Sequence, residues 1–296
     1  MNSLDGKVAI ITGAGGGIGR ECALYMAALG ARVVVNDLAS TDAGSKAEQV
    51  AQEIRDAGGD AFANTDSVSE VNGAHRLVDS AIERFGGLDV LVNNAGILRD
   101  RMLANMTVDE WDAISAVHLR GTFLTTQRSA AYWRQQRKAN APVSGSVINM
   151  SSGSGLHASV GQSNYAAAKS GIATFTLVAA KEMQRYGCRA NSVAPTARTQ
   201  LTSSTDRLVE IMKPPDDPTA FDKWHPENLA PVVAYLAGPS CSLTGQVLGV
   251  FGDEVGIYQP WTVHQTLHNH GNRWDFASLE AAFAGSAPLP PSVGMM

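Results

Sequence analysis

The sequence predicts an α/β fold: a doubly wound parallel sheet of about seven strands with helices on both faces. Two kinds of segment alternate along the 296 residues, namely short apolar runs and longer amphipathic stretches. The apolar runs are continuous, which is typical of parallel strands buried on both faces. Glycines lie at many junctions between the two kinds of segment. Strands that alternate with helices in this way form parallel sheets with short connections.

Four apolar runs alternate with three amphipathic segments in the first part of the chain. Each amphipathic segment has apolar residues at helical spacing and is followed by a glycine, at Gly30, Gly58 and Gly86. Glycine is a common residue just after a helix. The expected strands cover residues 7–12, 32–37, 61–64 and 90–93, and the expected helices cover 17–29, 45–57 and 70–85.

The second half of the chain continues this alternation. Residues 107–137 are expected to form two helices joined near Gly121, and residues 164–186 one long helix. Further apolar runs predict strands, which cover residues 146–151, 189–194 and 246–251.

The chain shows no segment with the composition of a domain linker between these strands. We therefore expect one domain over residues 1–255, with an inserted segment at about 196–225 that belongs to it. Residues 256–296 are expected to form a C-terminal extension, whose last part is rich in proline and poorly ordered.

Composition excludes several classes of protein. The chain has 23 Lys and Arg against 28 Asp and Glu, which gives a formal charge of −5 and argues against a nucleic-acid partner held by a generally basic surface. It has no basic-then-apolar leader pattern, and no apolar run reaches the roughly 18 residues needed to span a bilayer. We expect a cytoplasmic protein without a membrane partner.

Cysteine and histidine usage gives no reason to expect a bound metal. The three cysteines form no CxxC pair, so neither a disulfide framework nor a cysteine-rich zinc site is predicted. His264, His268 and His270 form an HxxxHxH group without an obvious further ligand.

A glycine-rich turn follows the first expected strand, with the pattern TGxxxGxG over residues 12–19. Glycines at a strand-to-helix turn let backbone N–H groups approach a pyrophosphate, and the helix N-terminus faces the negative charge. A turn with a purely structural role is the alternative. The expected cofactor-binding residues of this turn are Gly13, Gly15, Gly17, Ile18 and Gly19.

Asp37 ends the second expected strand, 18 residues after Gly19. An acid near this spacing binds the adenosine ribose of a dinucleotide, and it repels a 2′-phosphate. The cofactor prediction is therefore NAD. An aspartate that only caps a turn is the alternative, and the nearby cations Arg20 and Arg32 leave NADP open.

Ser152, Tyr165 and Lys169 form the candidate catalytic group. Tyr165 and Lys169 lie four residues apart on an expected helix, so they share one face. Ser152 lies just past an expected strand, at the edge where open α/β sheets bind ligands. A cation beside a phenol lowers its pKa. Such a tyrosine can exchange a proton with an alcohol or ketone oxygen, which the serine hydroxyl can hold.

Together, these motifs and the segment NNAG at 93–96 resemble the classical short-chain dehydrogenase/reductase family over about residues 4–255. The resemblance implies a Rossmann-type domain, hydride transfer to or from a nicotinamide, a small-molecule substrate, a homo-oligomer (dimer or tetramer), and a substrate lid at about 196–225. It also implies that Asp66 holds the adenine, that Asn93 lies by the cofactor and that Thr199 approaches the carboxamide. The further cofactor contacts that it implies are Ser67, Ala95, Gly96, Tyr165, Lys169 and Pro195.

Two positions depart from the family pattern. His118 stands where the family usually has an asparagine, whose backbone carbonyl supports a water beside the catalytic lysine. Histidine offers the same carbonyl, so we expect activity with His118 in that place; a histidine without a role is the alternative. Thr196 follows Pro195 where the family often has glycine.

A narrower resemblance rests on ILRDR after the NNAG segment, VHLRG at 117–121 and GQSNYAAAK at 161–169. These segments are similar to the (3R)-hydroxyacyl-CoA dehydrogenase part of the multifunctional β-oxidation enzymes, which include 17β-hydroxysteroid dehydrogenase type 4. The resemblance implies NAD-dependent oxidation of a 3-hydroxyacyl thioester, or of a steroid alcohol, in lipid metabolism. Arg99 and Arg101 could reach CoA phosphates or form ordinary surface ion pairs. A 3-oxoacyl thioester reductase, a hydroxysteroid dehydrogenase and an inactive NAD-responsive binding module are the alternatives.

Overall fold

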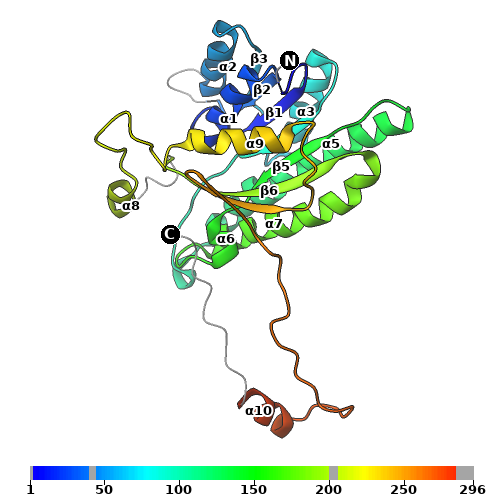
Figure 1. Ribbon diagram of the computed structural model, residues 1–296, viewed down its shortest axis with the longest axis vertical. Helices are drawn as coiled ribbons and strands as arrows, with labels where there is room; N and C mark the ends of the chain where they lie inside the picture. The colour runs from blue at the N-terminus through cyan, green and yellow to red at the C-terminus, as the bar shows by residue number, and fades with distance from the viewer. Residues whose placement is uncertain (1–2, 40–44, 200–205, 285–296) are drawn as a thin grey trace.

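The computed structural model describes residues 3–39, 45–199 and 206–284. It contains one eight-stranded sheet with the order β3-β2-β1-β4-β5-β6-β7-β8 (Figure 1). All neighbours pair in parallel except β7 and β8. The strand order changes direction between β1 and β4. Open α/β sheets bind ligands at the carboxyl ends of the strands at such a point. The strands are β1 (Val8–Thr12), β2 (Arg32–Asn36), β3 (Asp60–Asn64), β4 (Val90–Asn93), β5 (Ser146–Met150), β6 (Arg189–Thr196), β7 (Val247–Phe251) and β8 (Glu254–Ile257).

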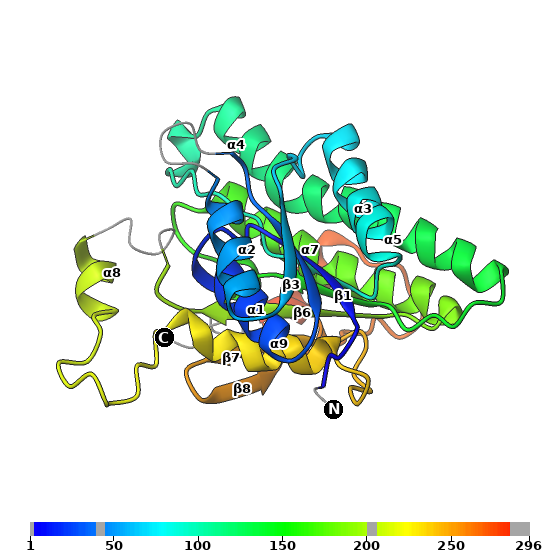
Figure 2. The same ribbon diagram turned by 90° about the horizontal axis from the view of Figure 1, so that it is seen from above.

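Helices cover both faces of the sheet, as the view from above in Figure 2 shows. One face carries α1 (Gly17–Ala28), α2 (Lys46–Asp56) and α9 (Ala230–Ala237). The other carries α3 (Val71–Phe85), α5 (Gly121–Lys138) and α7 (Ser163–Met183). The shorter helices are α4 (Val108–Ser115), α6 (Gly153–His157), α8 (Asp206–Ile211) and α10 (Phe276–Ala284).

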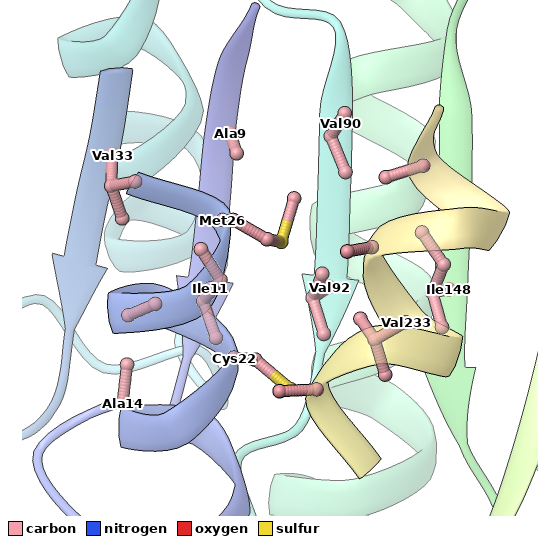
Figure 3. Close-up of a cluster of buried hydrophobic side chains, with 14 of the residues drawn as sticks. Ala9, Ile11, Ala14, Cys22, Met26, Val33, Val90, Val92, Ile148 and Val233 are labelled. Atoms are coloured by element: carbon pink, nitrogen blue, oxygen red, sulfur yellow. The ribbon is translucent and has the colours of Figure 1, made fainter. Parts of the chain in front are cut away.

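The core forms two layers because strand residues alternate between the faces of the sheet. Ile11 and Val33 pack under α1 and α9 with Met26 and Val233 (Figure 3). Their chain neighbours Ile10 and Val34 pack on the opposite face, under α3, α5 and α7. The three cysteines are free and buried.

The predicted fold class is confirmed, and the predicted strands and helices lie close to the observed ones. The joint expected near Gly121 is a π-helical turn, Ala116–Arg120, between α4 and α5. The sequence analysis did not include β8, which pairs antiparallel with β7 across a two-residue turn at Gly252 and Asp253. A Gly-Asp turn is itself a hairpin signal, but β8 is only four residues long, and most of it is exposed.

The chain leaves the sheet after β8 as an extended arm that ends in α10, well away from the body of the molecule (Figure 1). The sheet thus reaches Ile257, two residues past the predicted boundary at 255. Several large apolar side chains of the arm are exposed, namely Trp261, Val263, Trp274, Phe276 and Phe283. Among the described residues, no helix combines the length and apolar character needed to cross a bilayer. The cytoplasmic location stays a prediction.

Candidate active site

A cleft of about 600 Å³ lies at the carboxyl edge of the sheet. Its walls come from the turn after β1, the ends of β2, β4, β5 and β6, and the first turns of α7. Most of the predicted site residues line it, namely Gly13, Gly15, Gly17, Ile18, Asp37, Asp66, Ser67, Ala95, Gly96, His118, Ser152, Tyr165, Lys169, Pro195 and Thr199. Gly19 and Asn93 do not.

The glycine turn has the backbone that its sequence predicts. Gly13 and Gly17 have φ values of 62° and 52°, a conformation that favours glycine. A Cβ on Gly13 would lie 2.7 Å from Ala95 Cα, so the turn packs directly on the chain after β4. Gly19 serves this packing rather than the cleft, because its own Cβ would lie 2.3 Å from the Gly13 carbonyl oxygen.

Asp37 lies at the end of the cleft next to this turn. Its carboxylate accepts hydrogen bonds from the backbone N–H groups of Gly15 (2.9 Å) and Leu38 (2.8 Å). The residue therefore braces the turn as well as lining the cleft. The cations near it in the sequence are engaged elsewhere: Arg20 binds Glu21 and Glu53, and Arg32 lies over the ring of Phe85. Lys46, which the sequence analysis did not include, lines this end of the cleft.

Asp66 is held from both sides. Arg76 Nε donates to Asp66 Oδ1 at 2.8 Å, and Asn64 Nδ2 donates to Asp66 Oδ2 at 2.9 Å. Asn36 adds a hydrogen bond to the Asp66 backbone carbonyl at 2.9 Å. These three partners fix the position of Asp66, and none of them was predicted.

The Asn93 side chain points into the core instead of the cleft, so the predicted place of this residue beside the cofactor stays a prediction that only its backbone could fulfil. Its amide contacts Thr126 and Asn149 at 3.1 and 2.8 Å, and its carbonyl oxygen accepts from Thr125 at 2.7 Å. Asn94 lines the cleft instead and donates to the carbonyl oxygens of Thr12 and Gly13, both at 3.0 Å. Neighbouring residues of a strand point in opposite directions, so these two asparagines cannot both face the cleft.

Ser152, Tyr165 and Lys169 meet in the cleft, as their spacing predicts. Ser152 directly follows Ser151 at the end of β5 and caps α6, its Oγ accepting from the Ser154 N–H at 3.2 Å. Tyr165 and Lys169 lie on the first turns of α7, with Lys169 Nζ 5.5 Å from the centre of the Tyr165 ring. Lys169 is buried and donates to the Met150 carbonyl at 2.6 Å.

Burial controls the protonation of this group. It lowers the pKa of Lys169 to about 7 and raises the pKa of Tyr165, against a hydrogen bond with Ser152 that lowers it. The expected lowering of the Tyr165 pKa by Lys169 is therefore not the net direction here, because burial of the phenol disfavours its charged form more than the Ser152 hydrogen bond favours it. The Asp100 carboxylate raises the Tyr165 pKa further.

His118 lies in the π-helical turn and packs between Gly96 and Tyr165. Its Nε2 lies 2.8 Å from the Ile97 carbonyl oxygen and 3.1 Å from the Ile97 N. A Cβ on Gly96 would lie 2.5 Å from the imidazole. Burial, with the charge of Lys169 second, lowers the pKa of His118 to about 3, so the ring is neutral. The uncharged side chain thus packs against the ring of Tyr165.

Further polar residues of the cleft were not predicted. Ser154 and Gln162 line it beside Ser152 and Tyr165, and they are hydrogen-bonded to each other. Their proximity depends on the packing of α6 against α7, which no local sequence pattern specifies.

Comparison with known proteins gives consistent matches. A family model described as short chain dehydrogenase matches residues 7–209. The hydroxyacyl-CoA dehydrogenase ChsB1 of Mycobacterium tuberculosis is 44% identical over 96% of this chain and 91% of its own. Peroxisomal multifunctional enzyme type 2 of Drosophila melanogaster is 41% identical over 82% of this chain, which matches only 38% of that longer protein. The crystal structure of a short chain dehydrogenase from Mycobacterium avium superimposes with a TM-score of 0.86, with 45% identity over 99% of this chain and 100% of that one.

Proposed function

The chain belongs to the short-chain dehydrogenase family and is an oxidoreductase, and from this premise we propose that it uses NAD to oxidise a (3R)-3-hydroxyacyl-CoA to the 3-oxo form. The observation that carries the proposal is the convergence of Ser152, Tyr165 and Lys169 beside the glycine turn. The acyl-CoA substrate is supported by the similarity to ChsB1 over nearly the full length of both chains. The (3R) configuration rests on the resemblance of the sequence to the dehydrogenase part of the multifunctional enzymes.

The cleft fits a dinucleotide. Side chains at Gly13 or Gly15 would collide with Ala95 or Asp37, so the turn presents bare backbone to this end of the cleft. Backbone N–H groups at a helix N-terminus bind a pyrophosphate, and α1 begins at Gly17. Asp37 would bind the ribose hydroxyls. When bound, NAD supplies the acceptor for the hydride that leaves the alcohol carbon.

Preference for NAD over NADP follows from the charge of Asp37. A 2′-phosphate bound at this end would lie against its carboxylate, and like charges in proximity repel. Arg20 and Arg32 are engaged with other groups, so they do not offset this charge. Lys46 lines the same end, so it is the cation that would have to offset the Asp37 charge for a 2′-phosphate to bind.

The protein side of the reaction uses the three polar groups of the cleft. In oxidation, the Tyr165 phenolate accepts the proton of the substrate hydroxyl, and the Ser152 hydroxyl holds the same oxygen. Lys169, buried beside the tyrosine, stabilises the phenolate when it carries its own proton. Burial opposes the phenolate form, so oxidation is expected to rise with pH.

We also propose that the protein is a homo-oligomer, either a dimer or a tetramer. The C-terminal arm leaves the body of the molecule with exposed aromatic side chains, and Trp261 and Phe276 are 70% and 81% exposed. Large exposed apolar groups on an extended segment are typical of surfaces that bind another chain. The M. avium structure matches 99% of this chain, so the match includes much of the arm.

A screen of NAD reduction tests the proposed activity. The panel consists of (3R)- and (3S)-3-hydroxyacyl-CoA thioesters and steroid alcohols, each with NAD and with NADP. The proposal expects turnover of the (3R)-thioesters with NAD. Steroid turnover alone would favour a hydroxysteroid dehydrogenase, and dominant NADPH-dependent reduction of 3-oxoacyl thioesters would favour a reductase. NAD binding without turnover of any member would favour a binding module.

A further inference from the structure

A hydrogen-bonded row of side chains flanks the catalytic group at the mouth of the cleft. Gln162 Nε2 donates to Asp100 Oδ2 at 2.8 Å, and Ser154 Oγ donates to Gln162 Oε1 at 2.8 Å. Ser159 Oγ in turn donates to Ser154 Oγ at 3.0 Å. Gln162 and Ser154 both line the cleft. The amide of Gln162 is thus held at both ends.

These partners fix which way the Gln162 amide faces. A carboxylate only accepts hydrogen bonds, so the NH₂ end must face Asp100 and the carbonyl end must face Ser154. The amide nitrogen has two protons, and Asp100 accepts one of them. Among the described residues, none accepts a hydrogen bond from the second proton. Gln162 therefore has one donor left for a molecule bound in the cleft.

The backbone of Gln162 is fixed as well. The preceding carbonyl, that of Gly161, accepts from the Arg101 N–H at 2.8 Å, and the Gln162 carbonyl accepts from the Ala166 N–H in the first turn of α7 at 2.7 Å. Asn164, two residues on, is buried and donates to the Arg99 carbonyl at 3.0 Å. The free donor is therefore preorganised, which reduces the entropic cost of a hydrogen bond to a ligand.

Two members of the row, Gln162 and Ser154, lie close in sequence to the reacting residues Tyr165 and Ser152. Gln162 is the N-cap of α7, three residues before Tyr165 in the first turn of that helix. Ser154 follows Ser152 by two residues, and its N–H donates to the Ser152 hydroxyl at 3.2 Å. A substrate whose hydroxyl lies between Ser152 and Tyr165 can therefore extend along the cleft to Gln162, which lines the same space. In a 3-hydroxyacyl thioester the next polar group is the C1 carbonyl, two carbons from the hydroxyl-bearing carbon.

We propose that Gln162 is a specificity-determining residue whose free amide N–H donates to the thioester carbonyl oxygen of a 3-hydroxyacyl substrate. The inference rests on the proposed function and refines it, because it explains how the site selects an alcohol with a carbonyl in the β position. Asp100 has the supporting role of keeping the donor end of the amide turned away from Ser154.

Steady-state kinetics of the full-length protein test the proposal with two CoA compounds. One is the 3-hydroxyacyl-CoA thioester, measured as a substrate with NAD. The other is the matching thioether, in which CH₂ replaces the carbonyl, measured as a competitive inhibitor so that its turnover is not required. Gln162→Met keeps the length of the side chain and removes both polar ends. Gln162→Glu keeps the size and removes the donor.

Both variants are expected to lose about tenfold in kcat/KM for the thioester, the effect of one hydrogen bond to a neutral group. The inhibition constant of the thioether is expected to stay within about twofold, because the thioether never made that hydrogen bond. Gln52→Met is the matched control. Gln52 is exposed on α2, with its amide held between Asp56 (2.6 Å) and Arg55 (2.6 Å), and this change should leave both constants unaltered.

Two results would overturn the inference. An unchanged kcat/KM for the thioester would show that the amide donates nothing to the substrate. Equal losses for thioester and thioether would show that Gln162 only shapes the cleft. Neither result resembles failure of the proposed function, in which the unaltered protein itself would not oxidise the thioester.

Discussion

The imidazole of His118 lies edge-on against the ring of Tyr165, with the ring centres 5.1 Å apart and the planes at 90°. The contact places an uncharged ring behind the reacting phenol, since the pKa of His118 is lowered to about 3. His118 is therefore not expected to titrate in the folded protein at physiological pH.

The lowered pKa of His118 predicts how stability depends on pH. The unfolded chain takes up a proton on this residue below about pH 6.5, whereas the folded protein takes it up only near pH 3. Between these values the unfolded state binds more protons, so the free energy of unfolding falls as the pH falls. His118→Asn should remove up to about 1.4 kcal/mol per pH unit of this slope between pH 5 and 6. Urea unfolding at a series of pH values measures it, and equal slopes for both proteins would contradict the assignment.

Tyr165→Phe should abolish oxidation while NAD still binds. The change removes the hydroxyl that exchanges the proton and keeps the ring that packs on His118. The loss in kcat is expected to be at least about 10³-fold, within the range for removal of a general base. Calorimetric titration with NAD provides the control for folding and binding. Turnover close to that of the unaltered protein would refute the role of Tyr165.

Asp37→Asn should reduce the preference for NAD. The amide oxygen of asparagine can still accept from the Gly15 N–H, so the turn keeps its brace while the negative charge is lost. We expect the ratio of kcat/KM for NAD to that for NADP to fall about tenfold to a hundredfold, the range for a charge repulsion of about 1–3 kcal/mol. An unchanged ratio would mean that the cofactor phosphate does not approach this carboxylate.

Arg198 and Asp222 join the two ends of the segment that was expected to form the substrate lid. The two side chains form an ion pair, the Arg198 N–H donates to the Trp224 carbonyl at 2.7 Å, and the guanidinium donates to the Met212 carbonyl at 2.6 Å. Arg198→Met should destabilise the protein by about 1–3 kcal/mol, because it leaves partly buried acceptors unpaired.

The same variant should raise KM for the acyl substrate more than KM for NAD, since Asp37 and the glycine turn lie outside this segment and Thr199 is the one predicted cofactor contact within it. Thermal unfolding measures the loss of stability. Steady-state kinetics, with the acyl substrate and NAD varied in turn, measure the two KM values. An equal rise of the two KM values would indicate a general loss of structure. Lys213→Met serves as a control, because its ion pair with Glu210 in the same segment is exposed.

Removal of the C-terminal arm should change the oligomeric state. A chain that ends after Tyr258 retains all eight strands and the contact of Tyr258 with His157 (3.0 Å), but it lacks the exposed aromatic residues of the arm. Light scattering after size-exclusion chromatography should give a smaller assembly, or a weaker one at low protein concentration. The same mass per particle at all concentrations would show that the arm does not hold the chains together.

Much of the fold was predictable because local patterns encode it. Continuous apolar runs predicted β1 to β7, and helical spacing predicted α1 to α5 and α7, whereas the short helices α6 and α8 to α10 were not predicted. The glycine turn with Asp37 predicted one end of the cleft. The spacing of Ser152, Tyr165 and Lys169 predicted their convergence, since parallel strands bring their carboxyl ends to one edge. Strand β8 was not predicted because its four residues are too few to show a clear periodicity.

Local sequence patterns were thus enough to derive the fold class, the family and most of the residues that line the cleft. Three features of the site could be seen only in the folded chain: Asn94 rather than Asn93 faces the cleft, Gly19 packs against Gly13, and Gln162 is held between Asp100 and Ser154. The directions of the Tyr165 and Lys169 pKa shifts likewise depend on burial in the folded chain. Burial and hydrogen-bond partners come from segments far apart in the chain, whereas periodicity and spacing describe only neighbours along it.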